Sequence, residues 1–240
     1  MRRSLLGWIA AAVLAFGGAA FAYVFWFAGG SGQPSTELTT PGLSPPTSTG
    51  NSTTVPEESG SESFVIDQTR STARFEIDEV LNGSPKHVVG TTDQVVGQVR
   101  LDPEDLGTAE FSEIIVNART LATDSERRNR AMRGPVILNS GNDEHELITF
   151  TVTSVDGLEG AATVGETIDF TITGDLVIKG TTQPVAFDAT VTMLDKSTLE
   201  GSATAEITRD MFAIGIPSVP NVADVTNEVL IGIDFVASTG

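Results

Sequence analysis

The most constraining feature of this chain is an alternation of apolar and polar residues through positions 165–194, interrupted at one turn. Because the side chains of a β-strand point alternately to opposite faces, the pattern predicts two antiparallel strands with one apolar and one polar face. The turn is predicted at residues 179–184. The apolar positions are Ile168, Phe170, Ile172, Leu176 and Ile178 in the first run, and Val185, Phe187, Ala189, Val191 and Met193 in the second. A sheet face this apolar has to be covered, so the two strands belong to a larger β-structure.

Similar strand patterns recur through residues 63–240, which are predicted to form a single domain. They lie at 63–68, 71–80, 87–102, 110–120, 146–155, 197–208 and 228–238. Eight or nine strands that share one apolar face indicate an all-β antiparallel barrel or sandwich. Gly90 and Gly97 lie inside the third run and indicate bends or a bulge, as in strands that curl around a barrel.

One short helix is predicted at residues 123–133, between two strands. Thr123 and Glu126 form a capping-box pattern, arginines fill the last turn, and a Gly-Pro pair follows. The four arginines of this helix form the only basic cluster in an acidic domain. They fit either a solvated helix whose charges match its dipole, or a clamp in which Arg127 and Arg130 bind an anionic head group.

Residues 1–28 are predicted to form a single-pass membrane anchor. The run Leu5–Phe27 contains 23 residues without a charge, and a helix needs roughly 20 apolar residues to cross a bilayer. Arg2 and Arg3 precede it, so the rest of the chain is expected on the extracytoplasmic side of the cell membrane. The alternative is a cleaved signal peptide, because residues 20–22 have the small-x-small form of a cleavage site.

Residues 29–62 are rich in Ser, Thr, Gly and Pro and contain few apolar residues. A segment of this composition cannot bury a core, so a disordered linker is predicted. Such a linker would hold the domain near the membrane without fixing its orientation.

Composition argues against several classes of function. The absence of cysteine excludes disulfides, thiolate metal sites and a cysteine nucleophile. After the two N-terminal arginines the chain has 12 basic and 32 acidic residues, a balance that repels the phosphates of nucleic acids. His87 and His145 are too few for a three-histidine metal site, although Asp143, Glu144 and Glu146 could supply oxygen ligands, for example to calcium. No catalytic or nucleotide-binding motif occurs, so we expect no catalysis, no metal and no cofactor.

Several motifs, taken in order, resemble the YceI-like family. They are Ser71-x-x-x-Phe75, Gly90 and Gly97 flanking Val95-Val96, Leu121-Ala-Thr-Asp-Ser-Glu-Arg-Arg128, Ile148-Thr-Phe150, Gly174-Asp-Leu-Val-Ile-Lys-Gly-Thr-Thr182 and Arg209-Asp210-Met-Phe212. The similarity covers nearly all of residues 63–238. The sequence departs from the family pattern at Asn129, where an acidic residue is common, and at residues 142–146, where a Tyr-Pro segment is common.

The resemblance implies an extended lipocalin-like barrel whose internal channel binds a polyisoprenoid, quinone-like or similar amphiphilic lipid, in an exported bacterial protein. Combined with the alternation, it suggests which side chains face the channel: Phe75, Ile77, Ile114, Val116, Ile148, Phe150, Ile168, Phe170, Ile172, Phe187, Val191 and Ile207. Two alternatives stay open. Small barrels also fill their interiors with such residues and bind nothing, and a β-sandwich displayed on a stalk for interaction or adhesion would have a packed interior. The sequence does not predict an oligomeric state.

Overall fold

The computed structural model describes residues 30–35, 37–43 and 60–239. The predicted anchor, residues 1–28, lies outside these ranges, as do residues 29, 36 and 44–59 of the predicted linker. Across the described ranges, no helix is both long and apolar enough to cross a membrane.

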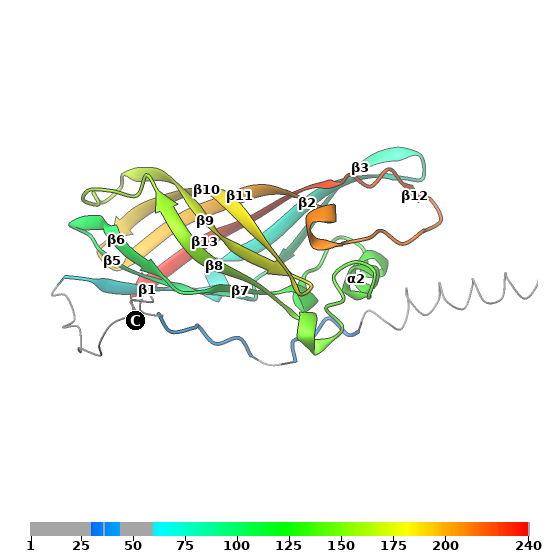
Figure 1. Ribbon diagram of the computed structural model, residues 1–240, viewed down its shortest axis with the longest axis horizontal. Coiled ribbons are helices and arrows are strands. Elements are labelled where there is room, and N and C mark those ends of the chain that lie inside the picture. The colour runs from blue at the N-terminus through cyan, green and yellow to red at the C-terminus, as the bar shows by residue number, and fades with distance from the viewer. Residues whose placement is uncertain (1–29, 36, 44–59, 240) are drawn as a thin grey trace, which may run out of the picture.

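The domain is mostly β-structure with one short α-helix (Figure 1). The strands are β1 (Glu62–Ile66), β2 (Thr72–Leu81), β3 (Ser84–Thr92), β4 (Val95–Val96), β5 (Gln98–Asp102), β6 (Asp105–Phe111), β7 (Ile114–Asn117), β8 (Leu147–Asp156), β9 (Thr167–Ile178), β10 (Thr181–Asp195), β11 (Thr198–Thr208), β12 (Val222–Ala223) and β13 (Glu228–Thr239). The helices are α2 (Glu126–Arg133) and the 3₁₀ turns η2 (Gln68–Arg70), η3 (Ala118–Thr120), η4 (Asp143–His145) and η5 (Arg209–Phe212).

The strands of the described residues all belong to one curled antiparallel sheet. Its main path is β4-β7-β8-β9-β10-β11-β13-β1-β5-β6. The long strand β13 pairs with β11 along one edge, and its other edge pairs with β2 near the start and with β1 near the end. β4 and β5, which lie at distant points of this path, are separated in sequence only by Gly97. The sheet therefore bends back toward itself and encloses an interior.

The predicted pair of strands at 165–194 is the hairpin β9–β10, and its register agrees with the alternation. Ile172 lies opposite Phe187, and Phe170 lies opposite Ala189, so the predicted apolar positions share one face. The predicted turn of residues 179–184 is too long. Only Lys179 and Gly180 form the turn, with φ of 52° and 73°, the left-handed conformations that a tight two-residue hairpin requires.

The predicted helix exists but begins later than expected. α2 starts at Glu126, and its N-cap is Ser125, whose hydroxyl accepts a hydrogen bond from the Arg128 N–H. Thr123, the predicted cap, instead donates two hydrogen bonds to the side-chain oxygen of Asn129, one from its N–H (2.7 Å) and one from its hydroxyl (2.8 Å). The buried Asn129 therefore ties the loop before α2 to the helix.

Two pieces of the predicted linker, residues 30–35 and 37–43, lie along the outside of the domain. They are the blue segment of Figure 1, which runs from the α2 end past β7. Disorder of the linker stays a prediction, and the contacts of these two pieces are described below.

Candidate ligand-binding site

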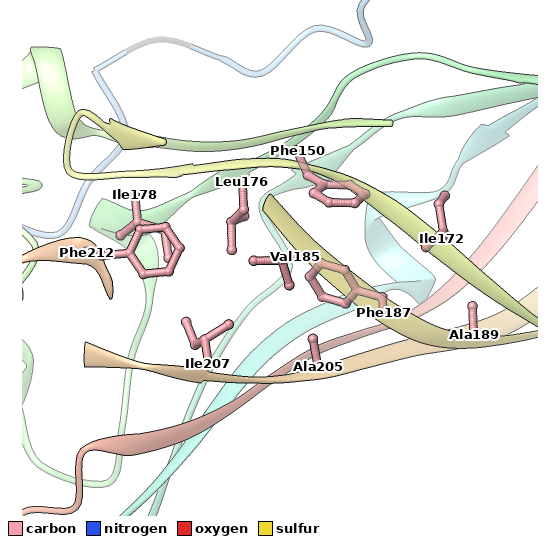
Figure 2. Close-up of a cluster of buried hydrophobic side chains, with 10 residues drawn as sticks. All are labelled: Phe150, Ile172, Leu176, Ile178, Val185, Phe187, Ala189, Ala205, Ile207 and Phe212. Carbon is pink, nitrogen blue, oxygen red and sulfur yellow. The ribbon is translucent and has the colours of Figure 1, made fainter. Parts of the chain in front are cut away.

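The concave side of the sheet is filled by apolar side chains that alternate with outward polar ones. Figure 2 shows ten buried members of this cluster: Phe150, Ile172, Leu176, Ile178, Val185, Phe187, Ala189, Ala205, Ile207 and Phe212. They come from β8, β9, β10, β11 and η5, so long strands separated in sequence contribute to one interior surface. Within it, the rings of Phe150 and Phe187 pack edge to face, with centroids 4.9 Å apart and planes at 71°.

The interior is not completely filled, because three cavities lie in a row along it. The central cavity has a volume of about 210 Å³. The mouth cavity, of about 620 Å³, shares Phe75, Leu121, Ile148, Ile178 and Ile231 with it. The far cavity, of about 50 Å³, shares Val99, Phe111, Phe170 and Phe235 with the central one. The shared lining residues place the three cavities next to one another, in an apolar path of adjoining cavities from the α2 end of the domain to the turns at the opposite end.

All twelve predicted channel residues line one of these cavities. The central cavity is lined by Phe75, Ile114, Val116, Ile148, Phe150, Phe170, Ile172 and Phe187, the mouth cavity by Ile77 and Ile207, and the far cavity by Ile168 and Val191. The structure thus brings these residues together around empty space. Whether they contact a ligand stays a prediction.

Polar groups are scarce in the central cavity and gather at the mouth. Among the residues that the structure describes, only Arg74 and Gln98 contribute polar side chains to the central cavity. Both are engaged elsewhere, Arg74 with Glu76 and Asp234 and Gln98 with the carbonyl of Pro41. The mouth cavity is lined by several charged and amide side chains, namely Glu79, Asn82, Asp124, Arg127, Arg128, Arg209 and Asn221. The path is therefore apolar inside and polar at one end.

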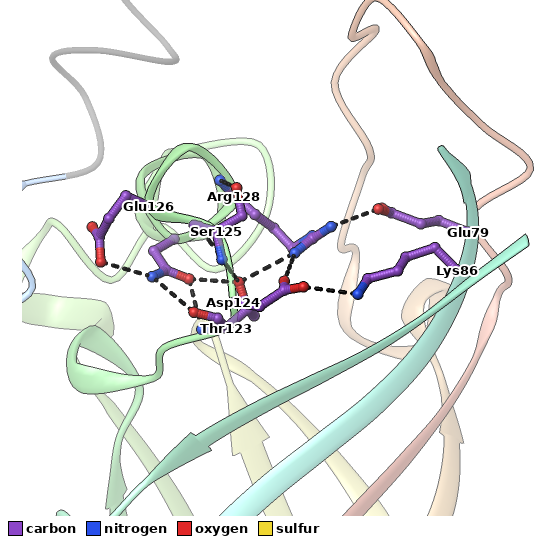
Figure 3. Close-up of polar contacts among 8 residues, drawn as sticks. Glu79, Lys86, Thr123, Asp124, Ser125, Glu126 and Arg128 are labelled. Atoms are coloured by element: carbon purple, nitrogen blue, oxygen red, sulfur yellow. Dashed lines mark hydrogen bonds and ion pairs between the residues drawn. The ribbon is translucent and has the colours of Figure 1, made fainter. Parts of the chain in front are cut away.

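A charged network holds α2 against the β2–β3 hairpin at the mouth (Figure 3). Arg128 pairs with Glu79 at 2.7 Å and with Asp124 at 2.5 Å. Lys86 pairs with Asp124 at 2.7 Å. The hydrogen bonds from Lys86 and then Arg128 lower the pKa of the Asp124 carboxyl. Arg128 is thus committed to fixing the position of the helix.

The two predicted head-group arginines occupy different places. Arg127 is exposed and lines the mouth cavity. Arg130, on the same helix, is not among the residues that line this cavity. A role for either residue in binding a head group stays a prediction, and the geometry favours Arg127.

One wall of the mouth was not predicted from the sequence. The loop between η5 and β13 contributes Ile214, Ile216, Pro217, Val219, Pro220, Val222 and Val225. Arg209 holds this loop by donating hydrogen bonds to three backbone carbonyls, those of Thr226 (2.7 Å), Ile214 (3.2 Å) and Val225 (3.2 Å). The alternation that predicted the strands is missing in this loop. Its many apolar residues are nevertheless a signal in the sequence that the loop covers part of the interior.

The acidic segment 143–146 is used by the protein itself. Asp143 pairs with Arg119 at 2.7 Å, and the buried Glu146 pairs with the same arginine at 3.1 Å. The part of the chain that the structure describes contains no group of three or more His, Cys, Asp or Glu residues placed to hold a metal ion.

Comparison with known proteins agrees with this architecture. Residues 64–237 match the YceI-like domain model. UPF0312 proteins of Staphylococcus aureus strains USA300 and COL are 27% identical over 177 residues, which is 71% of this chain and 91% of theirs.

Solved structures show a similar fold at low sequence identity. Burkholderia cenocepacia BcnA superposes with a TM-score of 0.55 at 19% identity, covering 72% of this chain and 99% of that one. A polyisoprenoid binding domain from Saccharophagus degradans, described as implicated in plant cell wall breakdown, gives 0.56 at 14% identity, covering 74% and 98%. Because the family model spans most of the sequence and these structures share the curled sheet, the chain belongs to the YceI-like family.

Proposed function

We propose that this chain is a membrane-anchored extracytoplasmic protein that binds a polyisoprenoid or similar amphiphilic lipid inside the sheet and carries out no catalysis. The row of three cavities with shared apolar walls carries this proposal. Burial of an isoprenoid chain would contribute roughly 25 cal/mol for each Å² of apolar surface removed from water. The description of the Saccharophagus degradans domain as polyisoprenoid binding points to the same ligand class.

The proposed container is an extended lipocalin-like barrel. Its closure would involve β4 and β5 as one strand bent at Gly97, since β4 pairs with β7 while β5 pairs with β1. A Cβ added at Gly97 would lie 2.4 Å from Cδ1 of Ile114, so a larger residue would displace the end of that side chain. A bend at this glycine lets one strand serve two parts of the wall.

The distribution of polar groups suits an amphiphile rather than a purely apolar molecule. An apolar chain would lie in the central and far cavities, where few polar groups would be left unpaired. The head group would remain in the mouth cavity, where Arg127 is exposed and its guanidinium can bind a phosphate or carbonyl oxygen. The anchor at residues 5–27 and the linker at residues 29–62 would keep this binding domain on the extracytoplasmic side of the cell membrane.

A pair of alanine-to-phenylalanine substitutions on β10 tests whether the cavity holds the lipid. Ala189 is buried and lines the central cavity, whereas Ala186 is exposed on the opposite face of the same strand. The full chain would be loaded with a fluorescent polyprenyl lipid and separated from free lipid. We expect Ala189→Phe to retain much less lipid than wild type and Ala186→Phe to retain as much. Equal retention by both variants would contradict binding in the central cavity.

A further inference from the structure

Residues 30–43, which we call the strap, dock on the domain through specific contacts in the two described pieces. Gly32 lies against the guanidinium of Arg133, and a Cβ added there would be 2.8 Å from Nη1. The Ser35 N–H donates to Glu146 Oε1 at 2.8 Å, and its hydroxyl donates to Oε2. Further along, Gln98 Nε2 donates to the carbonyl of Pro41 at 2.7 Å.

The contact with Glu146 reaches a buried group, because that residue is only 3% exposed. Burial alone raises the pKa of a carboxyl, yet the pKa of Glu146 is lowered because the two Ser35 donors, Asn117 and Arg119 together outweigh burial. Asn117 Nδ2 donates to Oε1 at 2.8 Å. Ser35 therefore donates two of the hydrogen bonds that stabilise the buried Glu146 carboxylate, and loss of these hydrogen bonds is unfavourable.

The strap leaves the domain at its mouth end. A Cβ added at Gly30 would lie 3.6 Å from Cα of Gly141, a residue of the loop that follows α2. Only residues 28 and 29 separate Gly30 from Phe27, the last residue of the predicted anchor. Three residue steps span at most about 11 Å. Docking of the strap would therefore place Gly30, and with it the α2 end of the domain beside Gly141, within roughly that distance of the anchor's outer end.

The two ends of the domain differ in the charge and polarity of their exposed residues. The rim of the mouth presents apolar residues of the loop between η5 and β13, with Ile216 37% exposed, together with the exposed Arg127. The acidic side chains that line the mouth cavity, Glu79 and Asp124, are paired with Arg128 and Lys86. The turns at the opposite end carry almost only acidic charges: Asp102, Glu104, Asp105, Asp156, Glu159, Glu166 and Asp195, with one base, Lys196. An acidic end is repelled by anionic lipid head groups, whereas an apolar rim with an arginine suits a lipid surface.

We propose that the strap fixes the orientation of the domain, so that the rim of the mouth cavity faces the bilayer in which residues 5–27 are anchored. The partner of this rim is the lipid bilayer itself. The inference rests on the proposed membrane anchor, and it differs from the sequence-based expectation of a linker that leaves orientation free. In this arrangement a lipid could enter the mouth cavity from the membrane without crossing water.

Energy transfer to a membrane dye tests the orientation. The chain has no cysteine, so single cysteines at Ile216→Cys or Val164→Cys would place a donor dye at the mouth or at the far end. Both residues are exposed in the structure. β9, which runs between the two ends, has 12 residues and extends about 36 Å. The full chain would be inserted into phosphatidylcholine vesicles that contain an acceptor dye on a lipid head group.

Matched variants of the strap provide the control. Gly32→Val with Ser35→Ala would undock the strap, because Gly32 has φ of +76° and contacts Arg133. Gly42→Val with Ser31→Ala makes the same chemical changes, and an added Cβ at Gly42 has no atom within 4 Å. We expect several-fold more transfer from position 216 than from position 164 in wild type and in the control pair. The difference should shrink strongly in the undocked variant.

The outcomes separate this inference from the proposed function. Equal transfer from both positions in wild type, or a difference that persists after undocking, would overturn the role of the strap while the chain still floats with the vesicles. Failure to float would overturn the strap proposal together with the membrane anchor. Lipid retention by the cavity is measured independently with the β10 variants.

Discussion

Removal of one ring of the Phe150–Phe187 pair should destabilise the domain by a measurable amount. Phe187 is 8% exposed, and replacement of a buried phenylalanine by alanine typically costs 3–5 kcal/mol. The ring already borders the central cavity, so it has fewer neighbours than a fully packed side chain. We therefore expect Phe187→Ala to cost about 3 kcal/mol, the lower end of that range. For a domain of this size, the melting temperature should fall by roughly 6–12 °C.

A double-mutant cycle isolates the contribution of the edge-to-face contact. Edge-to-face pairs contribute about 0.5–1.5 kcal/mol beyond the burial of their area, so Phe150→Ala and Phe187→Ala should show a coupling energy in that range. Phe187→Leu is the control, because it keeps a large apolar side chain without the ring and should lower the free energy of unfolding less than Phe187→Ala does. Urea unfolding of lipid-free protein measures all four corners. A loss below about 1 kcal/mol for Phe187→Ala, or no coupling, would refute the assigned packing.

Three further predictions concern the mouth and its hairpin. Arg128→Met should lower the free energy of unfolding in urea by about 2 kcal/mol, because Glu79, which is 8% exposed, loses its partner. A second substitution, Glu79→Gln, should restore part of this loss, and no recovery would contradict the pairing. Asn129→Ala should cost about 2 kcal/mol in the same assay, since Asn129 is 1% exposed and ties the preceding loop to α2; an unchanged midpoint would contradict that role. Hydrogen bonds to Asp78 and then Glu76 raise the pKa of His87. The contribution of His87 to stability is therefore complete below the unfolded pKa of 6.5 and is lost as the pH rises through the folded pKa. The difference in unfolding free energy between wild type and His87→Gln should shrink to zero over that pH range, and a difference that does not change with pH would contradict the prediction.

The strands with regular alternation could be predicted well because one physical rule determines them. In β9 and β10 every second residue faces the interior, so the sequence predicts both the face and the pairing of Ile172 with Phe187. Together with the family resemblance, the same rule gave twelve channel positions, and each of them lines one of the three cavities. Alternation does not reveal whether the enclosed space is filled, because a packed barrel and a hollow one have the same pattern.

The features that were missed depend on irregular backbone or on contacts distant in sequence. β6 was not predicted as a strand of its own, because Gly107 interrupts a short pattern. The loop that forms one wall of the mouth contains Pro217 and Pro220 and has no period of either helix or strand. Arg209 acts on backbone carbonyls up to 17 residues away, and Ser35 meets Glu146 across 111 residues. Contacts between residues this far apart in the sequence cannot be predicted from local sequence patterns.

The central claim is that the interior holds a lipid, and native mass spectrometry with organic extraction tests it most directly. The full chain would be produced in a bacterial envelope, purified in mild detergent and measured before and after incubation with polyprenyl lipids. We predict a complex that releases a lipid of defined mass, with less of it bound to the Ala189→Phe variant. A mass that corresponds to protein alone, both before and after incubation, would contradict the account.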